Sequence, residues 1–233
     1  IKKRIKFMKN FVILLLAVLA ISCSGAADKP ANVEAAPATA VIYGDTIVLT
    51  QPDLAAGKTI NEALAERASS REYSAEPLSL EELSSVLWAA AGVNRPNGHL
   101  TAPSALALYP VTVYAFTAEG VFRYNSELHV LVREVEGDYR ELSAAQDFAY
   151  TAPLNLVYVA DLAKFDASGI DRTKAEFLAG QDAAGYAQNV NLYAAGNGLK
   201  AITRGSLKSA EVLKLLSLDP KQYTVVLAQT VGK

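Results

Sequence analysis

The stretch Arg67-Ala68-Ser69-Ser70-Arg71 sets two arginines four residues apart around a serine, and Thr101-Ala102-Pro103-Ser104-Ala105 follows further along the chain. Guanidinium groups offer planar sets of donors and the serine adds a hydroxyl, so this combination suits a phosphate group. The alternative interpretation is a pair of solvated arginines at a helix end, where they favour the helix dipole. Little else suggests chemistry, because the chain holds two histidines and one cysteine.

The first residues have the pattern of an export signal. Residues 1–10 carry five basic side chains, an unbroken apolar run follows over residues 11–21, and small residues surround Cys23. This order is typical of a secretory signal, and the run is shorter than the roughly 20 residues that a membrane span needs. We therefore predict a signal peptide over residues 1–22, with Met8 as a candidate start. The run before Cys23 resembles a bacterial lipoprotein signal, which implies lipidation of Cys23; an ordinary signal peptide is the alternative.

The rest of the chain divides into a tether and one domain. Residues 23–40 are rich in alanine and proline without a period, which predicts a flexible tether, and residues 41–233 are predicted to form a single domain. All five basic residues before Cys23 leave with the signal, so 17 basic and 24 acidic residues remain, a net charge of −7. This balance argues against nucleic acid as a partner. The predicted location is the bacterial cell envelope, as an exported, membrane-anchored lipoprotein.

Helix signals are strong at three places. Thr59-Ile60-Asn61-Glu62 and Ser79-Leu80-Glu81-Glu82 are capping boxes, which predict helices through about Ala68 and up to Gly92. Residues 172–197 predict a long helix that is unusually rich in alanine and glycine. Because each glycine costs a helix about 1 kcal/mol relative to alanine, close approach of another backbone or of a symmetry partner is expected there.

Strand patterns alternate with these helices along the chain. Short β-branched and apolar runs predict strands, and two further segments predict helices over residues 142–150 and near residues 209–216. The interleaving indicates a mixed α/β or α+β class. The predicted strands or hairpins cover residues 41–49, 111–117, 120–124, 129–135, 154–160 and 223–228.

The polar side chains offer no conventional catalytic set. His99 lies in a loop and His129 begins a strand, and each is better explained as a surface or hydrogen-bonded polar residue than as a base. Neither a nucleophile elbow nor a spaced carboxylate pair stands out. An enzyme of this composition would rely on a bound organic cofactor.

Taken in order, the motifs resemble the FMN-dependent nitroreductase superfamily, most closely its azoline (thiazoline/oxazoline) dehydrogenase-like branch. The resemblance covers the chain from about Thr59 to its end. Its motifs are R-x-S-x-R at Arg67–Arg71, S-x-E-E-L-x-x-x-L-W-A-A-x-G-x-N at Ser79–Asn94, T-A-P-S-A-x-x-x-Y-P at Thr101–Pro110, G-V-F-R-Y at Gly120–Tyr124, Gly185 with Gln188-Asn189, and Gly198-Leu199.

The resemblance implies an α+β fold, with a mixed, mostly antiparallel sheet flanked by helices. It also implies a homodimer with two FMN sites at the subunit interface and the long helix at the dimer axis. Arg67, Ser69 and Arg71, helped by the backbone of Ala68, would hold the FMN phosphate and ribityl chain. The remaining implied site residues are Pro103, Ser104 and Ala105 of the other subunit at the flavin ring, Gln146 at the flavin edge, and Thr203, Arg204 and Gly205, whose backbone N–H approaches flavin N5.

The implied activity is a hydride relay through flavin N5, to or from a small-molecule or peptide-derived substrate, with NAD(P)H as a candidate donor. No side chain is nominated as general acid or base. Arg204 would raise the flavin potential if it faces the ring, or else points to solvent. Lys233 is either a remaining phosphate contact or without a role. The alternatives are a non-catalytic, degenerate lipoprotein of this fold that binds FMN or another ligand, and a purely structural envelope lipoprotein.

Overall fold

A computed structural model describes residues 41–233, so the predicted signal peptide, tether and Cys23 lie outside the described residues. Within this range the chain forms one sheet in the order β1-β2-β5-β4-β3-β6-β8-β7, and every pair of neighbouring strands is antiparallel. The strands are β1 (Val41–Tyr43), β2 (Thr46–Val48), β3 (Val111–Phe116), β4 (Gly120–Asn125), β5 (Val130–Glu136), β6 (Leu154–Asp161), β7 (Lys200–Arg204) and β8 (Tyr223–Gly232).

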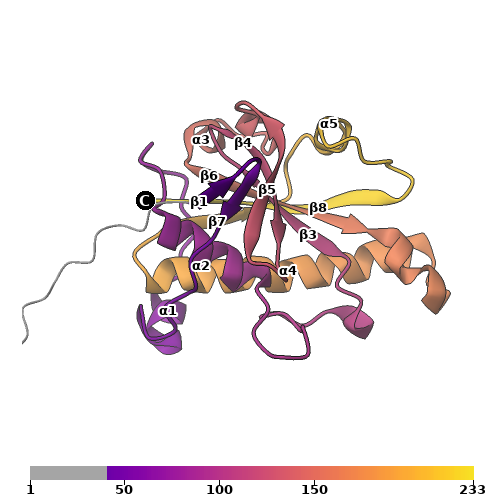
Figure 1. The fold of residues 1–233 in the computed structure, drawn as a ribbon, viewed down its shortest axis with the longest axis horizontal. Coiled ribbons are helices and arrows are strands. Elements are labelled where there is room, and N and C mark those ends of the chain that lie inside the picture. Colours follow the sequence, from indigo (N-terminus) through magenta and orange to yellow (C-terminus); the bar gives the residue numbers. More distant parts are fainter. Residues whose placement is uncertain (1–40) are drawn as a thin grey trace, which may run out of the picture. The chain divides into compact units, whose positions relative to one another are not determined.

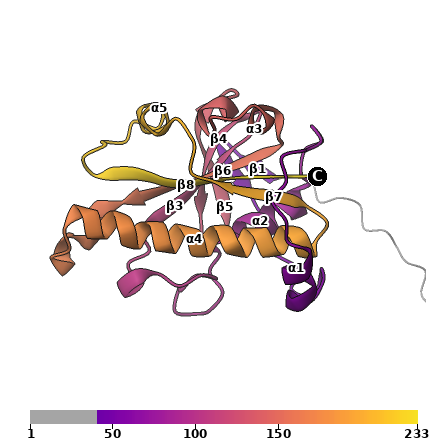
Figure 2. The same ribbon diagram turned by 180° about the vertical axis from the view of Figure 1, so that it is seen from behind.

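Helices cover both faces of the sheet (Figures 1 and 2). On one face lie α1 (Ile60–Glu66), α2 (Leu80–Ala91) and the long α4 (Arg172–Gly196), and on the other lie α3 (Phe148–Thr151) and α5 (Ser209–Leu215). Three 3-10 turns complete the set, η1 (Ala105–Ala107), η2 (Arg140–Leu142) and η3 (Leu162–Ser168). The predicted α+β class with a mostly antiparallel sheet is confirmed. None of the helices in residues 41–233 has the length and apolar character to cross a membrane.

Both capping boxes form as predicted. The Glu62 carboxylate accepts from the Thr59 backbone N–H at 2.8 Å, and the Glu82 carboxylate accepts from that of Ser79 at 2.7 Å. The reciprocal bonds from the Glu62 and Glu82 N–H groups to the cap hydroxyls are present as well. These local contacts satisfy N–H groups that a helix start leaves unpaired, so the two helices begin where the sequence indicates.

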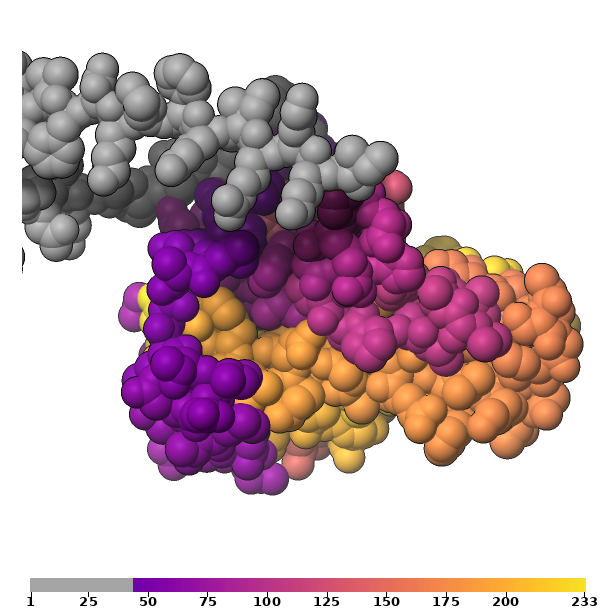
Figure 3. Space-filling model, turned by 90° about the horizontal axis from the view of Figure 1, so that it is seen from below, coloured from indigo at the N-terminus to yellow at the C-terminus, as the bar shows by residue number. Residues whose placement is uncertain are grey.

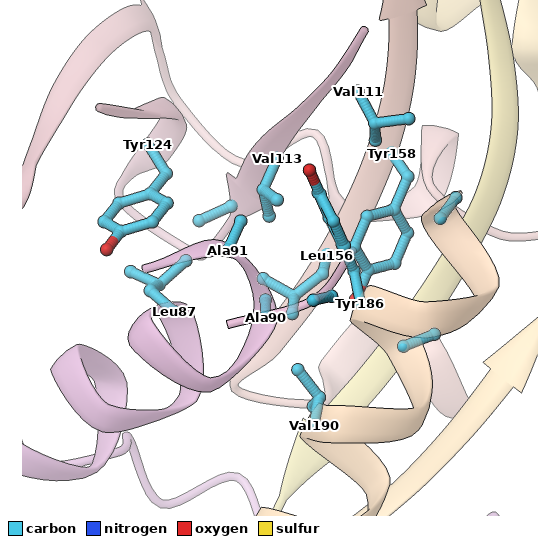
Figure 4. Close-up of a cluster of buried hydrophobic side chains, with 14 of the residues drawn as sticks. Leu87, Ala90, Ala91, Val111, Val113, Tyr124, Leu156, Tyr158, Tyr186 and Val190 are labelled. Carbon is cyan, nitrogen blue, oxygen red and sulfur yellow. The ribbon is translucent and has the colours of Figure 1, made fainter. Parts of the chain in front are cut away.

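The main core lies between the sheet and the helices α2 and α4. Leu87 of α2, Leu156 of β6 and Tyr186 of α4 are completely buried and meet there (Figure 4). Burial of one such side chain contributes about 1.5–3 kcal/mol. A smaller cluster on the opposite face joins α5 to the sheet through residues such as Val212 and Phe116. The core therefore packs α4 against the sheet.

The small residues of α4 allow its C-terminal end to meet α1. A Cβ placed at Gly196 would lie 3.6 Å from the Cβ of Ala63, and one at Gly185 would lie 3.7 Å from that of Ala102. A Cβ at Gly180, in contrast, would meet no described atom within 4 Å. An added Cβ at Gly196 or Gly185 would therefore make ordinary van der Waals contact, so packing within the subunit does not require glycine at any of these three positions.

The structure corrects two predictions of local structure. Residues 142–150 do not form one helix, because the backbone groups of Ser143 and Ala145 bond instead to Arg204 and Ser206. The chain also forms β7, which sequence reasoning treated only as a turn. Its Ala201, Ile202 and Thr203 pair with β8. Because this pairing joins distant segments, no local sequence pattern predicts the strand.

Candidate functional site

The Arg67–Arg71 segment leaves α1 and runs extended along the outer edge of β7. Ser69 forms a parallel bridge with Ala201, and the Ser70 N–H donates to the Ala201 carbonyl at 3.1 Å. The side chains of Arg67, Ser69 and Arg71 are exposed. Within residues 41–233, neither guanidinium forms an ion pair or a side-chain hydrogen bond. The segment therefore offers two free, planar donor groups beside a serine.

The fold brings this segment and Thr203–Gly205, at the end of β7, to one sheet edge. Arg204 stands three residues beyond Ala201 on the same strand, which corresponds to roughly 10 Å at 3.3 Å per residue. Gly205 is exposed, whereas the Thr203 hydroxyl accepts from the Asn191 amide at 3.1 Å. Two of the predicted contact regions are therefore neighbours in space, although about 130 residues separate them in the sequence.

Gln146 joins this region through backbone contacts of its loop. The Ala145 N–H donates to the Ser206 carbonyl at 3.2 Å, and the Lys208 N–H donates to the Leu142 carbonyl at 3.1 Å. The Gln146 side chain is exposed. The predicted flavin-edge amide thus lies on a loop that is bonded directly to the segment following Gly205.

Arg204 is the buried charge of the site. It is 5 % exposed, and its guanidinium donates to Thr230 Oγ1 at 3.0 Å, to the Ser143 carbonyl at 2.7 Å and to Asn155 Oδ1 at 3.0 Å. Burial lowers the pKa of Arg204 to about 10, which still leaves it protonated at neutral pH. The structure rules out the expectation that this side chain points to solvent.

The Pro103–Ala105 segment is bound to α4, away from Arg67 and Arg71. Ser104 Oγ donates to Asp182 Oδ2 at 2.5 Å, and the Ala105 N–H donates to Asp182 Oδ1 at 3.0 Å. Asp182 lies 14 residues before Gly196, against which α1 packs, so the two places are about 21 Å apart along α4. We call the outer edge of β7, along which Arg67–Arg71 runs, the arginine edge, and the bonds of Ser104 and Ala105 to Asp182 the clasp. One subunit does not bring Pro103–Ala105 to the arginine edge, and only the exposed Pro103 is outside the clasp.

Sequence reasoning missed Asp182. It is 5 % exposed on the buried stripe of α4 that includes Ala179, Ala183 and Tyr186. The sequence feature that could have indicated it is a single carboxylate on an alanine-rich helix face, because a buried carboxylate must accept hydrogen bonds from nearby donors.

Three other polar residues are occupied by local contacts. His129 Nε2 donates to the Thr50 carbonyl at 2.8 Å and its Nδ1 meets the Tyr124 hydroxyl at 2.8 Å, while burial lowers its pKa. His99 Nδ1 meets the Tyr109 hydroxyl at 2.8 Å. The interpretation of both histidines as hydrogen-bonded polar residues is confirmed. Lys233 pairs with Glu76 at 2.6 Å and with Glu82 at 3.4 Å, so its ammonium already has anionic partners.

Comparison with known proteins now identifies the class. Residues 64–233 match the nitroreductase family, and the chain belongs to that family. A Methanocaldococcus jannaschii protein named as a nitroreductase is 34 % identical over 194 residues, covering 79 % of this chain and 96 % of its own length. The crystal structure of a nitroreductase from Ralstonia eutropha is 35 % identical, with a TM-score of 0.76, over 85 % of this chain and 94 % of that one.

Two more distant structures share the fold. One is a chain of the Escherichia coli microcin synthetase complex McbBCD, with 21 % identity, a TM-score of 0.60, and coverage of 80 % of this chain and 77 % of that one. The other is a Desulfovibrio desulfuricans nitroreductase in complex with FMN, with 22 % identity, a TM-score of 0.53, and coverage of 76 % and 87 %. At these identities the likeness concerns the fold alone.

Proposed function

We propose that this protein is an FMN-dependent oxidoreductase that relays a hydride between a donor and a small-molecule or peptide-derived substrate. The observation that carries the proposal is the pair of unpaired guanidinium groups, Arg67 and Arg71, beside Ser69 on the edge of β7. Membership of the nitroreductase family supports an oxidoreductase activity, and the Desulfovibrio relative bound to FMN supports this choice of cofactor.

The donor set fits the cofactor. A phosphate monoester needs charge and several directed donors, and Arg67, Ser69 and Arg71 offer both without having to break an existing ion pair. When bound, FMN would supply the ring that takes up and returns the hydride. The protein's own part is to bind and orient: the Ala68 backbone would help at the phosphate, a backbone N–H of the Thr203–Gly205 segment would approach flavin N5, and Gln146 would meet the edge of the ring.

The proposed active form is a homodimer. Ile60 and Leu64 of α1, Leu106 of η1 and Phe177 of α4 are between 53 % and 64 % exposed. Figure 3 shows α1, the loop through η1 and α4 together on one face of the molecule. A hollow of about 330 Å³ lies between α1, α2 and α4, lined partly by Trp88 and Tyr193. A second copy on this face would cover these apolar groups and present its own Pro103–Ala105 segment to the arginine edge, which one subunit cannot do by itself.

The electron donor and substrate are proposed at the level of chemistry. NAD(P)H is the proposed hydride donor. The fold shared with the microcin synthetase chain supports a peptide-derived azoline as one substrate class, and a small nitroaromatic or quinone-like acceptor is the other. We further propose that Cys23 is lipidated after export, which is tested by membrane fractionation of the full chain against its Cys23→Ala variant. Equal membrane fractions would overturn that anchor.

FMN binding is tested on the purified protein by its absorption spectrum and by titration with FMN. Arg67→Ala combined with Arg71→Ala should weaken binding by at least about a hundredfold, since each charge-assisted hydrogen bond contributes about 1.5–3 kcal/mol. Arg172→Ala is the matched control, because Arg172 is an exposed arginine already engaged by Glu176. A protein that stays colourless with excess FMN would refute the cofactor, and unchanged affinity in the double variant would refute the phosphate assignment.

A second experiment separates catalysis from binding alone. Anaerobic NAD(P)H should bleach the flavin absorption of the loaded wild-type protein, and a later acceptor should restore it. If the protein binds FMN tightly but neither NADH nor NADPH bleaches it, the binding-only alternative is favoured.

A further inference from the structure

The Arg204 guanidinium donates its hydrogen bonds to neutral groups. Its three acceptors are a hydroxyl, a backbone carbonyl and a side-chain amide oxygen. Thr230 and Asn155 are completely buried, and the Thr230 hydroxyl donates to Asn155 Oδ1 at 2.6 Å. Asn155 Nδ2 in turn donates to the Ala149 carbonyl at 2.7 Å. Within residues 41–233 no carboxylate approaches this guanidinium to ion-pair distance.

An uncompensated buried charge is unusual, because desolvation without a counter-ion costs several kcal/mol. A neutral side chain could supply the same link to the Ser143 loop at a smaller cost. The cage therefore points to a use for the charge itself, since its neutral acceptors keep the guanidinium in place without cancelling its field.

The field of Arg204 reaches the segment that carries Arg71. Tyr73 belongs to the chain segment that follows Arg71, and its hydroxyl donates to the Ser70 carbonyl at 2.7 Å. Burial raises the pKa of Tyr73, while the positive charges of both Arg204 and Arg71 act to lower it. The buried charge and the arginine edge thus share one electrostatic environment.

We propose that Arg204 in its neutral cage is a fixed positive charge that favours the reduced, negatively charged form of the flavin over the oxidised form. The inference rests on the proposed function, and it assigns Arg204 an electrostatic rather than a catalytic part. Uptake of two electrons and one proton leaves the flavin ring with one negative charge, so a nearby cation stabilises the reduced form selectively. The electrons and the proton come from the hydride donor, or from dithionite and solvent in the test.

The test is an equilibrium reduction titration of the FMN-loaded protein with dithionite against a reference dye. Arg204→Gln keeps hydrogen-bond donors but removes the charge, and it should lower the midpoint potential by about 30 mV, a tenfold change in the ratio of reduced to oxidised binding for two electrons. For comparison, Coulomb's law gives an energy of this order for two unit charges at an assumed separation of roughly 10 Å and an effective dielectric constant near 20. Arg204→Lys keeps the charge and should retain most of the wild-type potential.

Two further variants separate charge from structure. Asn155→Asp sets a carboxylate against the guanidinium and should lower the potential as Arg204→Gln does, without removing Arg204. This variant decides the matter if Arg204→Gln does not fold. Thr230→Val removes one hydrogen-bond acceptor of Arg204 but no charge, so it should reduce thermal stability and leave the flavin midpoint potential unchanged.

The outcomes are distinct. Potentials that are unchanged in both Arg204→Gln and Asn155→Asp, or shifted equally in Arg204→Lys and Arg204→Gln, would overturn the inference and leave the flavin assignment intact. A wild-type protein that binds no FMN would instead overturn the proposed function and this inference with it.

Discussion

Removal of the Asp182 carboxylate should release the loop through Thr101–Tyr109 from α4. Asp182 accepts from Ser104 Oγ at 2.5 Å and from the Ala105 N–H at 3.0 Å, and Ser104 Oγ accepts in turn from the Tyr109 N–H at 2.8 Å. Beyond this clasp, Leu106, Ala107 and Tyr109 hold positive φ values of 54°, 54° and 46°, a region unfavourable for side chains other than glycine. The clasp therefore holds a strained loop.

The magnitude follows from the bonds. Hydrogen bonds to a charged group contribute about 1.5–3 kcal/mol each, and relief from burying the carboxylate offsets part of the loss. We expect Asp182→Ala to lower the free energy of unfolding by about 2–4 kcal/mol, and Ser104→Ala by about 1–3 kcal/mol. Because the two residues share one bond, the double variant should lose about 1–2 kcal/mol less than the sum.

Urea unfolding measures these values, at one protein concentration and without added FMN so that ligand and subunit linkage stay constant. Gln181→Ala is the matched control, because Gln181 is exposed on the neighbouring position of α4 and its change should stay within about 0.5 kcal/mol. Hydrogen exchange should also quicken at the Ala105 amide in Asp182→Ala. Additive losses in the double variant, or a loss below about 0.5 kcal/mol for Asp182→Ala, would refute the clasp.

Two further predictions concern a glycine pair and a histidine. Gly92→Ala should lower the melting temperature, because its Cβ would lie 2.2 Å from Trp88 Cδ1 and 2.7 Å from the Trp88 carbonyl oxygen. Gly180→Ala should instead add about 0.5–1 kcal/mol of helix stability, since a Cβ there meets no described atom within 4 Å. Equal changes in melting temperature for the two variants would contradict this packing. Burial lowers the pKa of His129 below its ordinary value of 6.5, so the folded state binds fewer protons than the unfolded state and stability should fall as the pH drops below about 6.5. His129→Asn, which tolerates the φ of 53°, should flatten that part of the dependence of melting temperature on pH, and an unaltered slope would assign it to other groups.

The elements that sequence reasoning predicted well depend on contacts between near neighbours. The capping boxes at Thr59 and Ser79 join residues three apart, and they define α1 and α2 correctly. The alternating and apolar runs predicted most strands, and the buried run at Leu154–Asp161 became an interior strand of the sheet. The ordered motifs around Arg67–Arg71 and Thr101–Pro110 were sufficient to indicate the family.

The tertiary structure decided what depends on distant partners. β7 exists because Lys200–Arg204 pairs with β8, and the predicted helix over residues 142–150 is interrupted because Arg204 and Ser206 bind its backbone. The Ser104–Asp182 clasp and the Arg204 cage join residues between 26 and 78 positions apart. The sequence by itself thus determined the starts of α1, α2 and α4 and most strands, since these follow from local periodicity and capping, whereas the place of Arg67–Arg71 beside β7 depends on the distant pairing of Ser69 with Ala201. Only the folded chain decided that Arg204 is buried without a counter-ion and that Ser104 is bound to α4, because burial and long-range pairing arise when the sheet and α4 come together.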